Sequence, residues 1–256
     1  MVFCSRLQQD EIVRRIRNVF KQLKKTISMS FKEFTKELNG NRVEGELVKT
    51  IFYSLLTSVI FLAVVYFFKL RYIENCVPKY GYYLLFSGLS IALIMPVVRQ
   101  VRAYKEMACM SGMMVGMTIG MISGFLLGFF TASTNGMFIG GFFGVFVGIA
   151  IGVWNGKCCG VMGAMEGIMA GFMGGLMGAM TSFMLLNDNN LKLAGIISFA
   201  ISAVIMFGLN FMIYKEMKET DRQRKEDHMM TVVLTFVLIA ITTWLIVFGP
   251  RSAIFG

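Results

Sequence analysis

Sulfur-bearing side chains recur at helical spacing in the middle of this chain. Two stretches repeat methionine at every fourth position, and the resulting candidates for an ion pathway are Met113, Met117, Met121, Met165, Met169, Met173 and Met177. Thioether sulfur is a soft ligand that suits Cu(I) or Ag(I), so stacked methionines would offer successive low-charge sites along a pore. Methionine is also a flexible apolar residue that fills gaps between helices, and this second interpretation stays open.

Three thiols and one carboxylate accompany the methionines. Cys109, Cys158 and Cys159 flank the methionine stretches and are candidate metal ligands, although cysteine is also an ordinary small apolar residue in membrane helices. Glu166 is the only acidic residue between positions 107 and 187. A carboxyl group inside a membrane span is costly and is a functional candidate by default. It would be protonated, paired with Lys157, or part of a proton or cation path.

A few polar residues of the apolar stretches are further candidates for the same path. These are Thr118, Ser123, Asn135, Asn155, Thr181 and Asn210. Pro96 is expected to kink its helix and to free a carbonyl group toward a cavity, because proline has no N–H to donate.

The sequence offers no catalytic constellation, and we expect that the protein is not an enzyme. Its single histidine, His228, excludes a histidine-rich metal site. The chain has no GxxxxGK[ST] motif, and its periodic glycines follow no predicted strand, so they do not form a dinucleotide-binding fingerprint. One acid without a base or nucleophile beside it is not a mechanism.

The combination of MxxxM and GxxxG motifs is similar to that of the copper uptake trimers, which carry the two motifs on neighbouring helices. This resemblance implies Cu(I) as the transported ion. It covers the short motifs alone, because this chain has more predicted spans and no methionine-rich external tail.

Composition and charge distribution predict an all-α, polytopic integral membrane bundle. Charged residues make up 16% of the 256 residues, against about a quarter in soluble domains. Seven largely uncharged stretches are long enough to cross a bilayer, which takes about 20 helical residues. The predicted spans are about 47–69, 80–98, 107–130, 136–156, 159–186, 193–214 and 229–249. A re-entrant segment around Glu166, which would leave six spans, is the alternative for 158–187.

Glycines repeat at intervals of four through three consecutive spans and predict glycine-zipper helices. The expected packing positions are Gly112, Gly116, Gly120, Gly124, Gly136, Gly140, Gly144, Gly148, Gly152, Gly163, Gly167, Gly171 and Gly175. Small residues at this spacing let helix axes approach closely in lipid. A step of four drifts about 40° on a helix of 3.6 residues per turn, so one straight neighbour cannot follow the stripe. Either the helices cross steeply, or the fourth span contacts different neighbours in its two halves; we expect that span to be central and buried.

The chain divides into a basic amphipathic segment, 1–46, and the bundle, 47–256. Ile12, Ile16, Val19, Leu23 and Ile27 form one apolar face of the segment among many Lys and Arg residues. This face would bind anionic lipid, or else pack on the protein's own loops or a partner. Twenty of the Lys and Arg residues fall on one side of the predicted topology and five on the other. This bias predicts a plasma or inner membrane protein with a cytoplasmic N-terminus and an external C-terminus, and its net charge of +10 requires no nucleic acid.

Two functional hypotheses follow from these patterns. The first is a channel or transporter for a small cation, with Cu(I) as the most specific version. The second is a non-catalytic subunit or scaffold of a larger membrane complex, packing through its glycine-zipper helices. In either case the chain is expected to form a homo-oligomer or to join a membrane complex.

Overall fold

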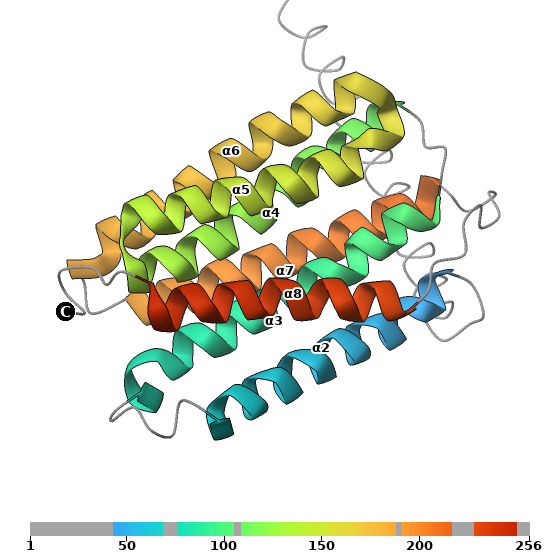
Figure 1. Cartoon of the computed structure of the whole chain (residues 1–256). Coiled ribbons are helices and arrows are strands. Elements are labelled where there is room, and N and C mark those ends of the chain that lie inside the picture. Colours follow the sequence, from blue (N-terminus) through green and yellow to red (C-terminus); the bar gives the residue numbers. More distant parts are fainter. Residues whose placement is uncertain (1–42, 69–75, 105–108, 188–190, 217–227, 250–256) are drawn as a thin grey trace, which may run out of the picture.

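The computed structural model describes residues 43–68, 76–104, 109–187, 191–216 and 228–249, and these form a bundle of α-helices (Figure 1). The helices are α2 (Val43–Phe68), α3 (Cys76–Ala103), α4 (Cys109–Asn135), α5 (Met137–Gly156), α6 (Gly160–Met184), α7 (Leu191–Glu216) and α8 (His228–Phe248). Short 3₁₀ turns, Lys157–Cys159 and Leu185–Asn187, follow α5 and α6. The amphipathic segment predicted before residue 43 lies outside the described residues.

Six of these helices, α3 to α8, are long and apolar enough to cross a membrane. The helical membrane fold predicted from the sequence is therefore confirmed. α2 is 26 residues long, and its side chains are described over Thr50–Val65, which is an apolar stretch, so the seventh span predicted from the sequence stays a prediction. The segment around Glu166 is one continuous helix of 25 residues, α6, so the re-entrant alternative is wrong.

The turn between α4 and α5 is tighter than predicted. The predicted spans 107–130 and 136–156 left the polar stretch 131–135 between them for the turn, but α4 continues to Asn135 and the break is Gly136 alone. Gly136 has φ 93° and ψ 164°, a conformation open essentially only to glycine. The hydroxyl groups of Thr131 and Ser133 donate to carbonyl oxygens four residues earlier, so both side chains remain within the buried helix. Gly136 is thus a turn residue and not the packing position predicted for it.

Helices α4, α5 and α6 pack on one another through backbone contacts at glycine. A Cβ atom built on Gly124 would lie 2.9 Å from the backbone nitrogen of Gly175, and one on Gly152 would lie 2.7 Å from the carbonyl oxygen of Gly167. No real Cβ atom fits at such distances, so these positions accept only glycine. The remaining predicted glycines of α4 to α6 are buried as well, including Gly112.

The glycine stripe of α5 lies between α4 and α6 along its length, so the predicted change of neighbour between its two halves was wrong. Gly144 lies against Gly128 of α4 and Gly175 of α6, and Gly152 lies against Gly120 of α4 and Gly167 of α6. What changes is the direction in which a Cβ atom would point, toward α4 at Gly144 and toward α6 at Gly152.

The prediction that α5 is central was wrong, because α4 occupies that place. α4 packs on α3, α7 and α8 as well as on α5 and α6, and its Phe129 and Phe130 are fully buried in the core. α5 instead leaves Phe138, Phe142 and Phe146 exposed. Figure 1 shows α4, α5 and α6 together on one side of the bundle, with α2 at the opposite edge.

Polar contacts connect α4 to α7 and α8, outside the group formed by α4, α5 and α6. Ser111 at the start of α4 donates a hydrogen bond to Glu216 at the end of α7. Asn135 at the other end of α4 donates to the carbonyl oxygen of Leu245 in α8. The two ends of the central helix are therefore each tied to another element.

Candidate functional site

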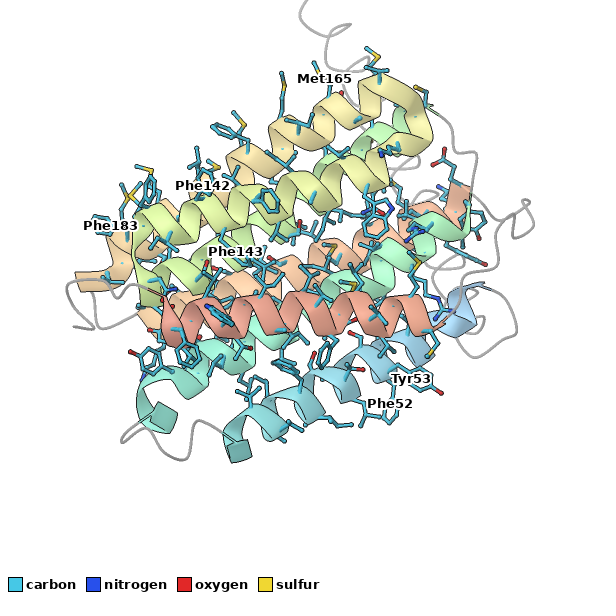
Figure 2. All side chains as sticks on the ribbon, in the orientation of Figure 1. Phe52, Tyr53, Phe142, Phe143, Met165 and Phe183 are labelled. Carbon is cyan, nitrogen blue, oxygen red and sulfur yellow. The ribbon has the colours of Figure 1, made fainter. Side chains whose placement is uncertain are left out.

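The methionines of α6 form an outward-facing file. Met165, Met169, Met173 and Met177 are each more than half exposed, whereas the glycines of the same helix are buried against α4 and α5. Figure 2 shows Met165 pointing away from the bundle. We call these four residues the Met face of α6. It continues at both ends of the helix with the exposed Met162, Met180 and Met184.

The candidate methionines of α4 lie nearer to the packed side. Met117 is 49% exposed, and Met113 and Met121 are half-buried. The backbone of Met121 lies directly against Gly174 of α6, a packing glycine outside the stripe predicted from the four-residue period. In a single copy of the chain, the seven methionines therefore lie at or near the outer surface of α4 and α6.

Methionine distinguishes this surface from the other outer surfaces of the bundle. The exposed apolar residues of α7 are mostly β-branched, among them Ile196, Ile197, Ile201 and Val204. A surface that only meets lipid tails needs no particular apolar residue, because the tails are as apolar as leucine. A file of thioethers instead offers adaptable packing or soft ligands.

Two of the three candidate cysteines come into contact at one end of α4 and α6, through the thiol of one and the backbone of the other. Cys159 Sγ, in the turn before α6, donates to the carbonyl oxygen of Cys109 at the start of α4, with 2.9 Å between the two atoms. Both cysteines are free thiols. The backbone of Cys158 lies in the same turn, and its side chain is outside the described residues. Within the described residues, no group of three or more His, Cys, Asp and Glu residues is placed to hold a metal ion.

Glu166 lies on α6 close to this end, on the flank of the Met face. It is three residues before Met169, which places it about 60° round the helix from that residue. Its side chain is half-buried. Lys157, its suggested partner, is exposed in the turn before α6, and the structure records no ion pair between these two described residues.

Most of the polar candidates bond to their own helices. Thr118 and Thr181 donate to the carbonyl oxygens of Met114 and Met177, and Ser123 and Asn155 donate to Gly120 and Ile151. Each of these bonds lies within one helix. Asn210 differs, because its side-chain amide makes no hydrogen bond among the described residues.

A polar seam between α2 and α3 was not predicted from the sequence. Thr50, Ser54 and Ser58 are buried along one side of α2, at the same four-residue spacing as the glycine stripes. Arg99 Nη1 donates to Thr50 Oγ1 at 2.8 Å, and Ser58 Oγ donates to the carbonyl oxygen of Gly88 at 3.4 Å. Small hydroxyl residues at this spacing join membrane helices as glycines do, so extending the search to serine and threonine would have found the seam.

The same seam includes a hydrogen bond next to Pro96, the proline that was expected to kink α3. Pro96 has no N–H, so the carbonyl of Ala92 loses its helical donor. Ser54 Oγ donates to this oxygen at 3.1 Å. The freed carbonyl is therefore bonded to α2, and its residue Ala92 lines the same cavity as Pro96.

The Met face, Glu166 and the two cysteines in contact, Cys109 and Cys159, lie within the glycine-packed group of α4, α5 and α6, and α4 and α6 supply all but one of these residues. Cys159 comes from the turn that joins α5 to α6. Comparison with protein-family models, with curated proteins and with solved structures finds no match to this chain.

Proposed function

We propose that this protein is a non-catalytic subunit of a membrane assembly, and that the Met face of α6 packs against the same face of a second copy. The exposure of this face supports the proposal, because α6 uses its opposite side for glycine contacts within the chain. The glycine stripes that were expected to bind other helices are thereby occupied inside one copy. The Met face is therefore the side of α6 that remains for contact with a partner.

Self-association suits this surface for a geometric reason. Two copies in one membrane share the same orientation, so a two-fold axis along the membrane normal brings identical positions of α6 together. Unbranched methionine side chains adapt to one another across such an axis and pack without a specific knob-and-hole fit.

Site-specific photo-crosslinking in membranes tests this contact. A photoreactive amino acid at Met169 should crosslink two differently tagged copies of the chain. The matched control is Val204, which is 72% exposed on α7, and the same group there should label lipid. Equal yields of the crosslinked pair from both positions, or none from Met169, would show that the Met face is an ordinary lipid-facing surface.

A second candidate function, transport of a soft cation such as Cu(I), is favoured by the approach of Cys159 to Cys109. When Met faces of several copies meet, their thioethers line a common path, with Glu166 on its flank and the thiols at its end. This hypothesis requires the assembly, because the methionines of one copy lie on its surface.

Silver uptake by vesicles containing the purified protein separates the two candidates. Replacing Met165, Met169 and Met173 with leucine conserves volume and apolar packing while removing the sulfur. Transport should be lost in this triple variant, whereas a photoreactive amino acid at Met177, which the variant leaves free for it, should still crosslink two copies. If the native chain forms the crosslinked pair but its vesicles take up no silver, the assembly role stands and the transport role does not.

A further inference from the structure

A groove of about 270 Å³ lies between α2, α3 and α7, far along the chain from the methionines. α3 forms its floor, with Leu93 and Pro96, and α2 and α7 form its walls. Its rim residues Ile51 and Phe207 are 37% and 41% exposed, so the groove opens on the outer surface of the bundle. In a membrane-spanning bundle this surface meets the acyl chains of the bilayer.

One polar side chain faces into this apolar groove. Asn210 lines it, is only 5% exposed, and has an Oδ1 atom without a hydrogen-bond partner. Its recorded hydrogen bond is to its backbone carbonyl oxygen, which lies 3.5 Å from Gln100 Nε2. The Oε1 atom of Gln100 is likewise buried without a partner.

An unsatisfied amide is unfavourable at this position. A buried polar group without a partner costs about 1–3 kcal/mol, and the bilayer core supplies no water to replace the partner. Turning the amide by half a rotation exchanges its oxygen and nitrogen, so Asn210 offers a donor or an acceptor to the groove. A molecule that occupies the groove and hydrogen-bonds to this amide would remove the cost.

The backbone of α3, which forms the floor of the groove, does not compete with Asn210 for a hydrogen bond to such a molecule. The one carbonyl that Pro96 deprives of its helical donor, that of Ala92, already accepts from Ser54. Asn210 is therefore the polar group that a ligand meets in the groove.

We propose that this groove binds one uncharged, hydroxyl-bearing lipid from the surrounding bilayer. Its hydrocarbon chain lies along α3, and its hydroxyl group bonds to the amide of Asn210. A hydroxyl both donates and accepts, so it satisfies either orientation of the amide. None of the described lining residues is charged, and a charged headgroup would be costly to bury there.

The size of the groove fits a single chain. At about 30 Å³ for each water molecule, it has room for roughly nine waters, which is close to the lower limit of known ligand pockets. This space accommodates part of one hydrocarbon chain with its hydroxyl group.

The test uses a long-chain alcohol that carries a photoreactive diazirine, with the full-length protein in lipid nanodiscs. Mass spectrometry should locate the adducts on the facing sides of α2, α3 and α7 in the native chain, and unlabelled alcohol should compete with them. Asn210→Leu should lower the labelling about three- to tenfold, the loss expected for one hydrogen bond. A diazirine hydrocarbon of the same length without the hydroxyl should label native and variant chains equally.

A pair of alanines on α7 provides the matched control for occupancy. Ala203 lines the groove and Ala200 is exposed outside it, so Ala203→Phe should abolish labelling and Ala200→Phe should not. Adducts spread evenly around α7 and unaffected by Ala203→Phe would overturn the site. Labelling by the hydrocarbon equal to that by the alcohol would overturn the role of Asn210. The native chain alone gives the adduct positions, so a variant that fails to fold does not decide the outcome.

Discussion

Ser54 Oγ lies 3.1 Å from the carbonyl oxygen of Ala92, the oxygen that Pro96 leaves without its helical donor. The serine of α2 therefore compensates for the helical hydrogen bond that the proline removes from α3. Their effects on stability should be coupled, because the hydroxyl is needed only while the proline is present.

Ser54→Ala should destabilise the native protein by about 0.5–1.7 kcal/mol, the range for a hydrogen bond between membrane helices. In a Pro96→Ala background the loss should shrink toward zero, because the substituted alanine restores an N–H for the Ala92 carbonyl. Denaturant titration in mixed micelles measures both values.

Ser58→Ala serves as the control for this cycle. Ser58 also joins α2 to α3, through Gly88, but its acceptor is not one that Pro96 frees. Its cost should be the same with and without the proline. An equal cost of Ser54→Ala in both backgrounds would contradict the compensation.

Thr50→Val should destabilise the bundle by about 1–3 kcal/mol, because it removes a hydroxyl acceptor from the buried guanidinium of Arg99. Thr57→Val is the matched change on the same helix. The hydroxyl of Thr57 donates to the carbonyl of Tyr53 within α2, so its loss should cost only a few tenths of a kcal/mol. Thermal unfolding of the two variants in detergent compares them, and similar losses would argue against a special role for Thr50.

Gly152→Ala should destabilise the α4–α6 unit by about 1–3 kcal/mol or more, because the added methyl group meets the backbone of Gly167. Gly208→Ala is the opposite case. Gly208 lies inside α7 with nothing within 4 Å of a built Cβ atom, so alanine should stabilise the helix by about 0.5–1 kcal/mol. Unfolding measurements in one detergent should therefore show shifts of opposite sign, and a stable Gly152→Ala variant would contradict the packing.

A variant that keeps Cys109 as its only cysteine tests the predicted orientation. The charge distribution predicts that this exposed thiol lies on the cytoplasmic side. A membrane-impermeant maleimide should therefore label it in inverted vesicles and not in intact cells. The reverse pattern would invert the predicted topology.

The glycine packing was predictable because it depends on backbone geometry alone. A four-residue stripe drifts round a helix by a fixed angle, so the rotation of the glycine positions from α4 toward α6 along α5 follows from their spacing, although α5 stays in contact with both helices. The central position of α4 was not predictable, since it depends on how Phe129 and Phe130 pack against helices distant in sequence. The turn was misplaced because serine, threonine and asparagine favour turns mainly in water. Inside a bundle, Thr131 and Ser133 bond to their own helix, and the helix continues.

The residues of the candidate site could be named from the sequence, but much of their placement in the bundle could not. Met165 follows Gly163 by two residues, about 200° round a helix, so their opposite faces are predictable from the spacing alone. The contact of Cys159 with the backbone of Cys109 depends on how α4 and α6 pack. Whether the Met face lines an interior or meets the outside depends on where the neighbouring helices pack. Asn210 was one of several polar candidates, and only the tertiary structure separates it from those that bond within their own helices.

Backbone-to-backbone contact has a mechanical consequence for α4, α5 and α6. Where side chains separate two helices, a rotamer change allows the helices to slide or tilt, but the seam between Gly152 and Gly167 holds no side chain that can rearrange. We therefore expect the three helices to move as one rigid body, so that a large conformational change within the described helices would displace this group against α3, α7 and α8 along the sides of α4.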